Sequence, residues 1–127
     1  MQKQVHYNLK TISESQETGI SRLAGILKTR RIREQRSITF LELAQLWGMK
    51  APGLPLTITI TRIAPRQLDS GNLEACLKHV QDGIADWLCG QYGKGQDRQE
   101  GLAWQYAQMR GKAREYAIEV AVESMVD

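Results

Sequence analysis

The sequence predicts a small α+β domain in which a mixed or antiparallel sheet packs against two main helices. Residues 56–63, 102–109 and 115–122 alternate apolar and polar side chains, as strands with one buried face do. Two long segments instead repeat apolar residues at spacings of three and four, which indicates helices. A chain of 127 residues buries enough apolar surface for one core, so we expect one domain over residues 1–127.

The first part of the chain predicts a short strand, a polar loop and a long helix. Val5, Tyr7 and Leu9 alternate with polar neighbours, which indicates a strand over residues 4–9, so residues 1–20 form this strand and a loop rich in Ser, Thr and Glu. From about Ser21 the apolar spacing becomes helical, and we expect this helix to end by Gly48.

The strand over residues 56–63 follows a turn at residues 51–55 that contains two prolines and a glycine. Its residues Leu56, Ile58 and Ile60 are expected in the core. The sequence leaves open whether the opposite face, which carries threonines, is packed or exposed to water.

A loop over residues 64–71 leads into the second main helix, expected from about Asn72 to Gly90. Asp69, Ser70 and Asn72 are all candidates for its N-cap, because each has a side-chain oxygen that can accept from the first free backbone N–H groups. After this helix, residues 110–114 are expected to join the last two strands as a hairpin.

Composition excludes several classes of protein. No apolar run approaches the ~20 residues that span a bilayer, and no signal-peptide pattern begins the chain, so we expect a cytoplasmic protein without a membrane partner. Cys76 and Cys89 are too few for a disulfide framework and lack zinc-site spacing, so buried thiols are expected. With His6 and His79 as the histidines, a metal here would be held by carboxylates, which favours Mg²⁺ or Mn²⁺.

Positive charge is concentrated at the start of the chain. The net charge is +3, yet residues 1–36 carry eight Lys or Arg against three Glu. This distribution suits a polyanion such as nucleic acid, and it is equally compatible with a solvated helix face.

Acidic residues and a lysine recur around the second helix. Asp69, Asp82, Asp86 and Asp97, with Lys78, are candidates for a metal-dependent phosphodiesterase site, because a divalent cation needs anionic oxygens and a lysine stabilises developing negative charge. The alternative is a solvated helix face with weak ion pairs.

The order of these segments resembles a known nuclease family. Residues 60–73, with the helix entry Asp-x-x-Asn-Leu, residues 77–86, residues 102–108 and the closing strand at 116–120 are similar to the RusA-like Holliday junction resolvases, small endonucleases common in phages and prophages. The likeness covers about residues 28 to 122 and includes the basic helix.

The resemblance implies a homodimeric α+β nuclease of a phage or prophage that binds four-way DNA junctions, a branched DNA, and cuts symmetrically related strands with Mg²⁺, or with Mn²⁺ as a substitute. It implies that the catalytic residues are Asp69, Lys78, Asp82 and Asp97. Asp69, Asp82 and Asp97 would be the metal ligands, with Asn72 as site support. The residues expected to contact DNA phosphates are Lys28, Arg30, Arg31, Arg33, Arg36, Arg62 and Arg66.

Two positions depart from the family pattern. Gly71 stands where an acidic residue usually precedes the asparagine, and Asp97 and Glu100 replace adjacent aspartates after the helix. Three hypotheses therefore remain: a Mg²⁺-dependent junction endonuclease, a RusA-like protein that binds branched DNA without cutting it, and a small phage scaffold or regulatory protein with no nucleic-acid role.

Overall fold

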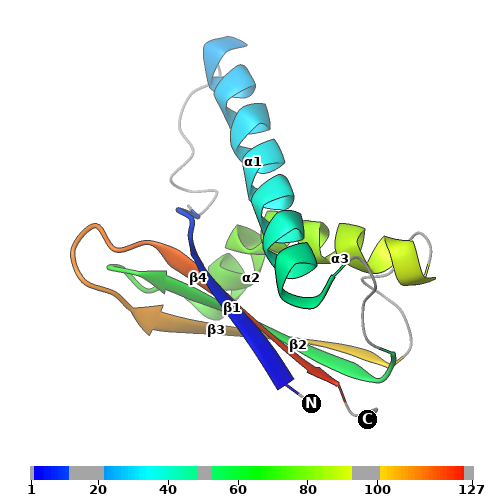
Figure 1. The fold of residues 1–127 in the computed structure, drawn as a ribbon. Coiled ribbons are helices and arrows are strands. Elements are labelled where there is room, and N and C mark those ends of the chain that lie inside the picture. Colours follow the sequence, from blue (N-terminus) through cyan, green and yellow to red (C-terminus); the bar gives the residue numbers. More distant parts are fainter. Residues whose placement is uncertain (1, 12–21, 49–52, 93–100, 125–127) are drawn as a thin grey trace.

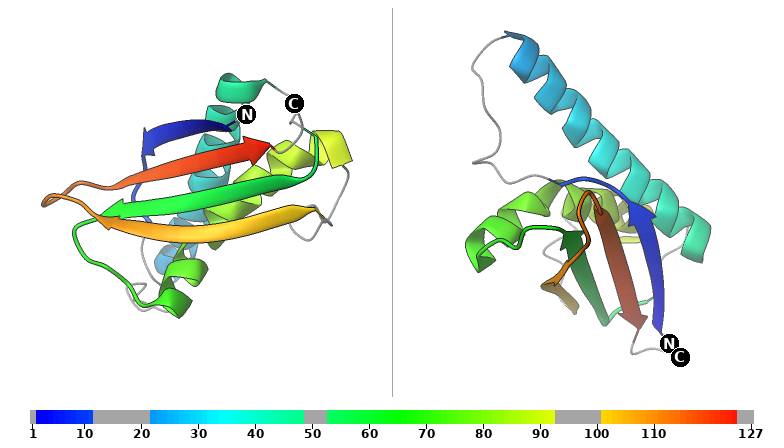
Figure 2. Two further views of the ribbon diagram at one scale, coloured as in Figure 1. Left: turned by 90° about the horizontal axis from the view of Figure 1, so that it is seen from below. Right: turned by 90° about the vertical axis from the view of Figure 1, so that its left-hand side faces the viewer.

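A four-stranded mixed sheet with helices on one face forms the described part of the chain. In the computed structural model, residues 2–11, 22–48, 53–92 and 101–124 are described. Their elements follow the order β1 (Gln2–Asn8), α1 (Arg22–Trp47), β2 (Leu56–Ala64), α2 (Ser70–Cys76), α3 (Lys78–Tyr92), β3 (Leu102–Arg110) and β4 (Ala117–Ser124). The three helices lie against the same face of the sheet, and its other face is uncovered (Figures 1 and 2). The predicted α+β architecture with a mixed sheet is confirmed, with three helices where two main ones were expected.

The strands of the sheet lie in the order β1-β4-β2-β3. β2 and β3 run parallel and are connected through α2 and α3, while β4 is antiparallel to both β1 and β2. The predicted hairpin between β3 and β4 is therefore wrong, since β2 lies between them. The connection crosses the end of β2, where the Gly111 N–H donates to the Ala64 carbonyl at 2.9 Å. Alternation had identified the strands and the buried face of β2, but it carries no information about which strand pairs with which.

The core lies between the sheet and the helices. Leu56, Ile58 and Ile60 are fully buried, as expected from the alternation in β2. The intervening threonines are partly exposed on the uncovered face, where the Thr59 hydroxyl donates to Gln105 Oε1 at 3.1 Å. The question that the sequence left open is answered: this face is partly exposed. Cys76 is a buried free thiol, while the side chain of Cys89 lies outside the described residues.

The second predicted helix is two helices, α2 and α3, that meet at Leu77. The Leu77 N–H reaches the carbonyls of both Leu73 and Glu74, at 3.1 and 3.3 Å. No proline or glycine marks this break, so the periodicity of the sequence did not predict it. With the chain redirected at Leu77, the side chains of Leu73, Leu77 and Val80 are all buried.

The helix α1 is anchored to the body only over its C-terminal half, and its N-terminal half projects beyond the sheet (Figures 1 and 2). The Tyr7 hydroxyl of β1 hydrogen-bonds the Thr39 hydroxyl at 2.6 Å, and the indole N–H of the buried Trp87 donates to the Gly48 carbonyl at 2.9 Å. α3 approaches α1 so closely at Gly83 that an added Cβ would lie 2.6 Å from the Arg36 carbonyl oxygen. The predicted end of this helix at Gly48 is confirmed, because α1 ends at Trp47.

Candidate functional site

The loop that follows β2 is fixed by two side chains from the parallel strands. Arg62 on β2 donates from Nη1 to the Arg66 carbonyl at 2.7 Å and from Nε to the Thr11 hydroxyl at 3.3 Å. Gln108 on β3 accepts from the Leu68 N–H at 2.9 Å and donates to the Leu68 carbonyl at 2.6 Å. These bonds hold the loop at the carboxyl ends of β2 and β3, the edge where sheets with parallel strands commonly bind ligands.

The expectation that Arg62 contacts DNA phosphates is corrected by this geometry. Its side chain is only 4% exposed, and its donors are directed to protein oxygens within the fold. A buried arginine that satisfies backbone and hydroxyl acceptors serves to order the loop. The β-strand pattern gave no signal for this, because a basic residue at the end of a strand is usually exposed.

Asp69 is the N-cap of α2, which decides among the three candidates. Its Oδ1 accepts from the Asn72 N–H at 2.9 Å, and its Oδ2 accepts from the Asn72 side-chain amide at 3.1 Å. The predicted pair of Asp69 and Asn72 is thus brought together. Asp69 is exposed, and a carboxylate has about four lone-pair positions, so capping leaves it able to accept further ligands.

Gly71 lies beside this carboxylate. A Cβ added at Gly71 would be 3.8 Å from Asp69 Oδ1, which is ordinary contact distance. An acidic side chain at this position would therefore extend next to Asp69 and could offer a second carboxylate to the same cation. Glycine leaves this position without a carboxylate, although the space beside Asp69 would accept a side chain.

The predicted metal ligands do not form one site within the described residues. Ligands of one Mg²⁺ ion lie ~2 Å from the metal, so the carboxylates of one site must lie close together. Across the described ranges, no three His, Cys, Asp or Glu side chains are close enough together to hold an ion. Asp97 and Glu100 lie outside the described residues. The described donors by themselves do not fit a Mg²⁺ centre.

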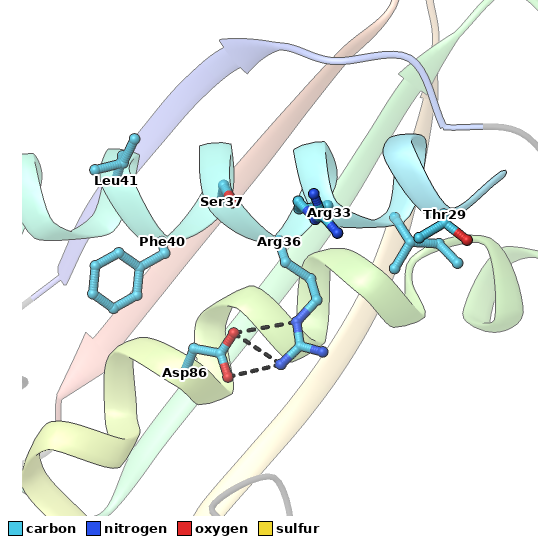
Figure 3. Close-up of a pocket in the computed structure, with 8 residues that line it drawn as sticks. Thr29, Arg33, Arg36, Ser37, Phe40, Leu41 and Asp86 are labelled. Atoms are coloured by element: carbon cyan, nitrogen blue, oxygen red, sulfur yellow. Dashed lines mark hydrogen bonds and ion pairs between the residues drawn. The ribbon is translucent and has the colours of Figure 1, made fainter. Parts of the chain in front are cut away.

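The charged residues of α3 face different surroundings. Lys78 is exposed at the start of α3, and Asp82 Oδ2 lies 3.8 Å from His79 Nδ1, which is too long for a hydrogen bond. Asp86 instead accepts two hydrogen bonds from Arg36 Nη2 of α1, at 2.9 and 3.0 Å, and one from its Nε at 3.2 Å (Figure 3). Hydrogen bonding to Asp86 raises the pKa of Arg36 above its usual value, so this guanidinium stays charged.

The other predicted DNA contacts fall into two groups on the surface. Lys28, Arg30 and Arg33 are exposed on the projecting part of α1, and Arg31 beside them is partly buried. The second group is at the edge of the parallel strands, where Arg66 and Arg110 line a depression of about 360 Å³ with Pro65 and Gln67. Sequence reasoning missed Arg110, because its proximity to Arg66 depends on the parallel pairing of Ala64 with Arg110.

Comparison with known proteins adds no family to this description. No family model and no curated protein matches this chain. Among the described residues, no helix is long and apolar enough to cross a membrane.

Proposed function

We propose that this protein binds branched DNA in a bacterial cytoplasm and cuts four-way junctions with Mg²⁺, or with Mn²⁺ in its place, as a structure-selective endonuclease of the RusA-like kind. The observation that carries the DNA part is the exposed arginine side chains on the projecting half of α1. Cationic side chains on a segment that stands clear of the body can reach phosphates without hindrance from the rest of the protein. Such contacts supply affinity and positioning with little base specificity.

Cleavage is proposed at Asp69. Its carboxylate is exposed at the end of a loop that Arg62 and Gln108 hold in place, and Arg66 and Arg110 lie near the same edge to bind the phosphate backbone. Rigid placement matters, because a displacement of about 1 Å in a reacting group can reduce a rate by ~100-fold. The described acids do not complete a metal site, so we assign the metal no step here.

A second candidate function is favoured by Gly71: binding of branched DNA without cleavage. The position closest to the Asp69 carboxylate carries no acid, although the space beside Asp69 accepts a side chain. One carboxylate fewer weakens the hold on a divalent cation, since hard cations depend on anionic oxygens. The residues proposed to contact DNA do not depend on which residue stands at position 71.

One experiment separates these functions. A labelled four-way junction and a linear duplex of the same sequence are incubated with Mg²⁺, Mn²⁺ or chelator, using wild type, Asp69→Asn and Gly71→Asp. Asparagine retains N-cap ability, so Asp69→Asn removes charge while keeping the cap. Paired, metal-dependent nicks by wild type that Asp69→Asn abolishes are expected for the endonuclease.

Junction binding without nicks by wild type, with cleavage gained in Gly71→Asp, would establish the binding function instead. If the wild type has no measurable affinity for the junction, and neutralising Arg30, Arg31 and Arg33 together changes nothing, both proposed functions are overturned. A role without nucleic acid then remains. Paired nicks require two active sites, so we also propose a homodimer, which sedimentation of the wild type with and without junction measures directly.

A further inference from the structure

A groove follows one face of α1, formed by two depressions that share Thr29 and Arg33. The one nearer the body has a volume of about 590 Å³ and the one nearer the free end about 540 Å³. Residues at spacings of three and four lie on the same face of a helix, which places Thr29, Arg33, Arg36 and Phe40 in one row (Figure 3). From Gly25 to Leu41 this face is about 24 Å long.

The side chains that line the groove carry more positive than negative charge. Arg30, Arg33 and Arg36 recur every three residues along it. Asp86 is the acid that lines it in the described structure, and Arg36 pairs with that carboxylate. Arg30 and Arg33 form no ion pair with an acid among the described residues. We therefore expect the groove to bind a ligand that carries several negative charges in a row.

Apolar side chains alternate with these arginines. Ile26 and Leu41 are 48% and 56% exposed, and Ile32 and Phe40 are partly buried between them. Figure 3 shows Phe40 and Arg36 pointing from α1 toward the same side of α3. The groove thus offers apolar surface on both sides of its arginines as well as between them.

This combination fits an unpaired nucleic-acid strand better than a duplex. A duplex hides the faces of its bases and presents phosphates, so exposed isoleucine and leucine would gain little from it. A single strand presents both, and proteins that bind one combine a cationic groove with aromatic side chains on which the bases stack, as Phe40 is placed to do in this groove. An acidic amphipathic helix would need a continuous apolar stripe, which the arginines interrupt at every turn.

We infer that the groove along α1 binds an unpaired DNA strand that a branched DNA presents beside its paired arms. The inference rests on the proposed DNA binding and deepens it by naming the part of the substrate that this surface recognises. The length of the groove corresponds to about seven stacked nucleotides, or to fewer nucleotides if the bound strand is extended.

Affinity for two labelled DNAs tests this inference with the full chain. One is a fork with an unpaired arm of about ten nucleotides, and the other is the fully paired duplex. The variant Ile26→Ala with Leu41→Ala removes apolar surface from the groove. Leu23→Ala with Leu27→Ala is its matched control, because these residues are 64% and 51% exposed on α1 and do not line the groove.

Wild type is expected to bind the fork about tenfold more tightly than the duplex, and the groove variant to lose most of this preference. The control variant should keep it. The double variant Arg30→Gln with Arg33→Gln should bind the fork with a weaker salt dependence. The slope of log K against log salt concentration should decrease in magnitude by about 1.4. Lys3→Gln, which removes from β1 a charge that lies over the Trp47 ring of α1, should leave affinity nearly unchanged.

Equal affinity for fork and duplex, or equal losses in the groove and control variants, would overturn the inference while leaving DNA binding intact. Failure to bind either DNA would remove the proposed function and this inference together. Displacement of the fork by polyglutamate, with the same dependence on Ile26 and Leu41, would assign the groove to an acidic protein partner instead.

Discussion

The two halves of α1 belong to one continuous helix but are stabilised in different ways. In the anchored half Gln35, Thr39 and Leu43 are buried against β1 and α3, whereas Leu23 and Leu27 in the projecting half are mostly exposed. Tertiary packing holds the anchored half, while helix propensity and continuity with the anchored half hold the projecting one. A segment that the core does not need is free to be selected for binding, and Arg30 and Arg33 are exposed on it.

The largest effect is expected from Gly83→Ala, which tests the contact that anchors α1. The new Cβ would meet the Arg36 carbonyl oxygen at 2.6 Å and the Thr39 Cβ at 3.0 Å, so the two helices must separate. We expect the free energy of unfolding to fall by about 2 to 3 kcal/mol, measured by urea denaturation. An unchanged unfolding midpoint would show that α1 and α3 are not packed as described.

A smaller loss is expected from Tyr7→Phe. The variant leaves the buried Thr39 hydroxyl without its 2.6 Å partner, at a cost of about 1 to 2 kcal/mol. Burial raises the pKa of Tyr7 above the usual tyrosine value of 10.0, so the phenol favours the folded state most below that pH and loses this contribution as the pH rises. The stability difference between wild type and variant should therefore be constant below pH 10.0 and narrow above it. A difference that widens with pH would contradict a buried neutral phenol.

Gly25→Ala makes the same change as Gly83→Ala in the projecting half, with the opposite sign expected. A Cβ at Gly25 has no atom within 4 Å, so alanine adds helix propensity without a clash. We expect the free energy of unfolding to rise by up to about 1 kcal/mol and helicity by circular dichroism to increase slightly. Destabilisation would mean that another part of the protein contacts this side of α1.

The smallest stability effect is expected from Asp86→Asn at the boundary between the two halves. Its ion pair with Arg36 is partly exposed, so its loss should change the unfolding free energy by at most about 0.5 kcal/mol, and less at high salt. The same variant removes an acid from the groove and should tighten DNA binding several-fold. Arg36→Gln, matched in stability but losing a cation, should weaken it.

Local features of the chain were readable from the sequence. The alternation over β2 predicted its buried face, the apolar spacing predicted α1 up to Gly48, and the side-chain oxygens before α2 included the true cap, Asp69. Each depends on interactions within a few residues, such as a cap bond across three positions or the twofold period of a strand. Such interactions are fixed once the order of residues is known.

Features that join distant residues were decided by the tertiary structure alone. The pairing of β2 with β3 placed Arg110 beside the loop of Arg66, burial turned Arg62 into a support of that loop, and α3 brought Asp86 to Arg36 across 50 positions. Periodicity states which face a residue occupies but not which element that face meets, because the partner is selected by the packing of the whole core. The sequence therefore determined most of the elements and the charged residue types on them, and the packed fold decided which of these residues reach the surface together.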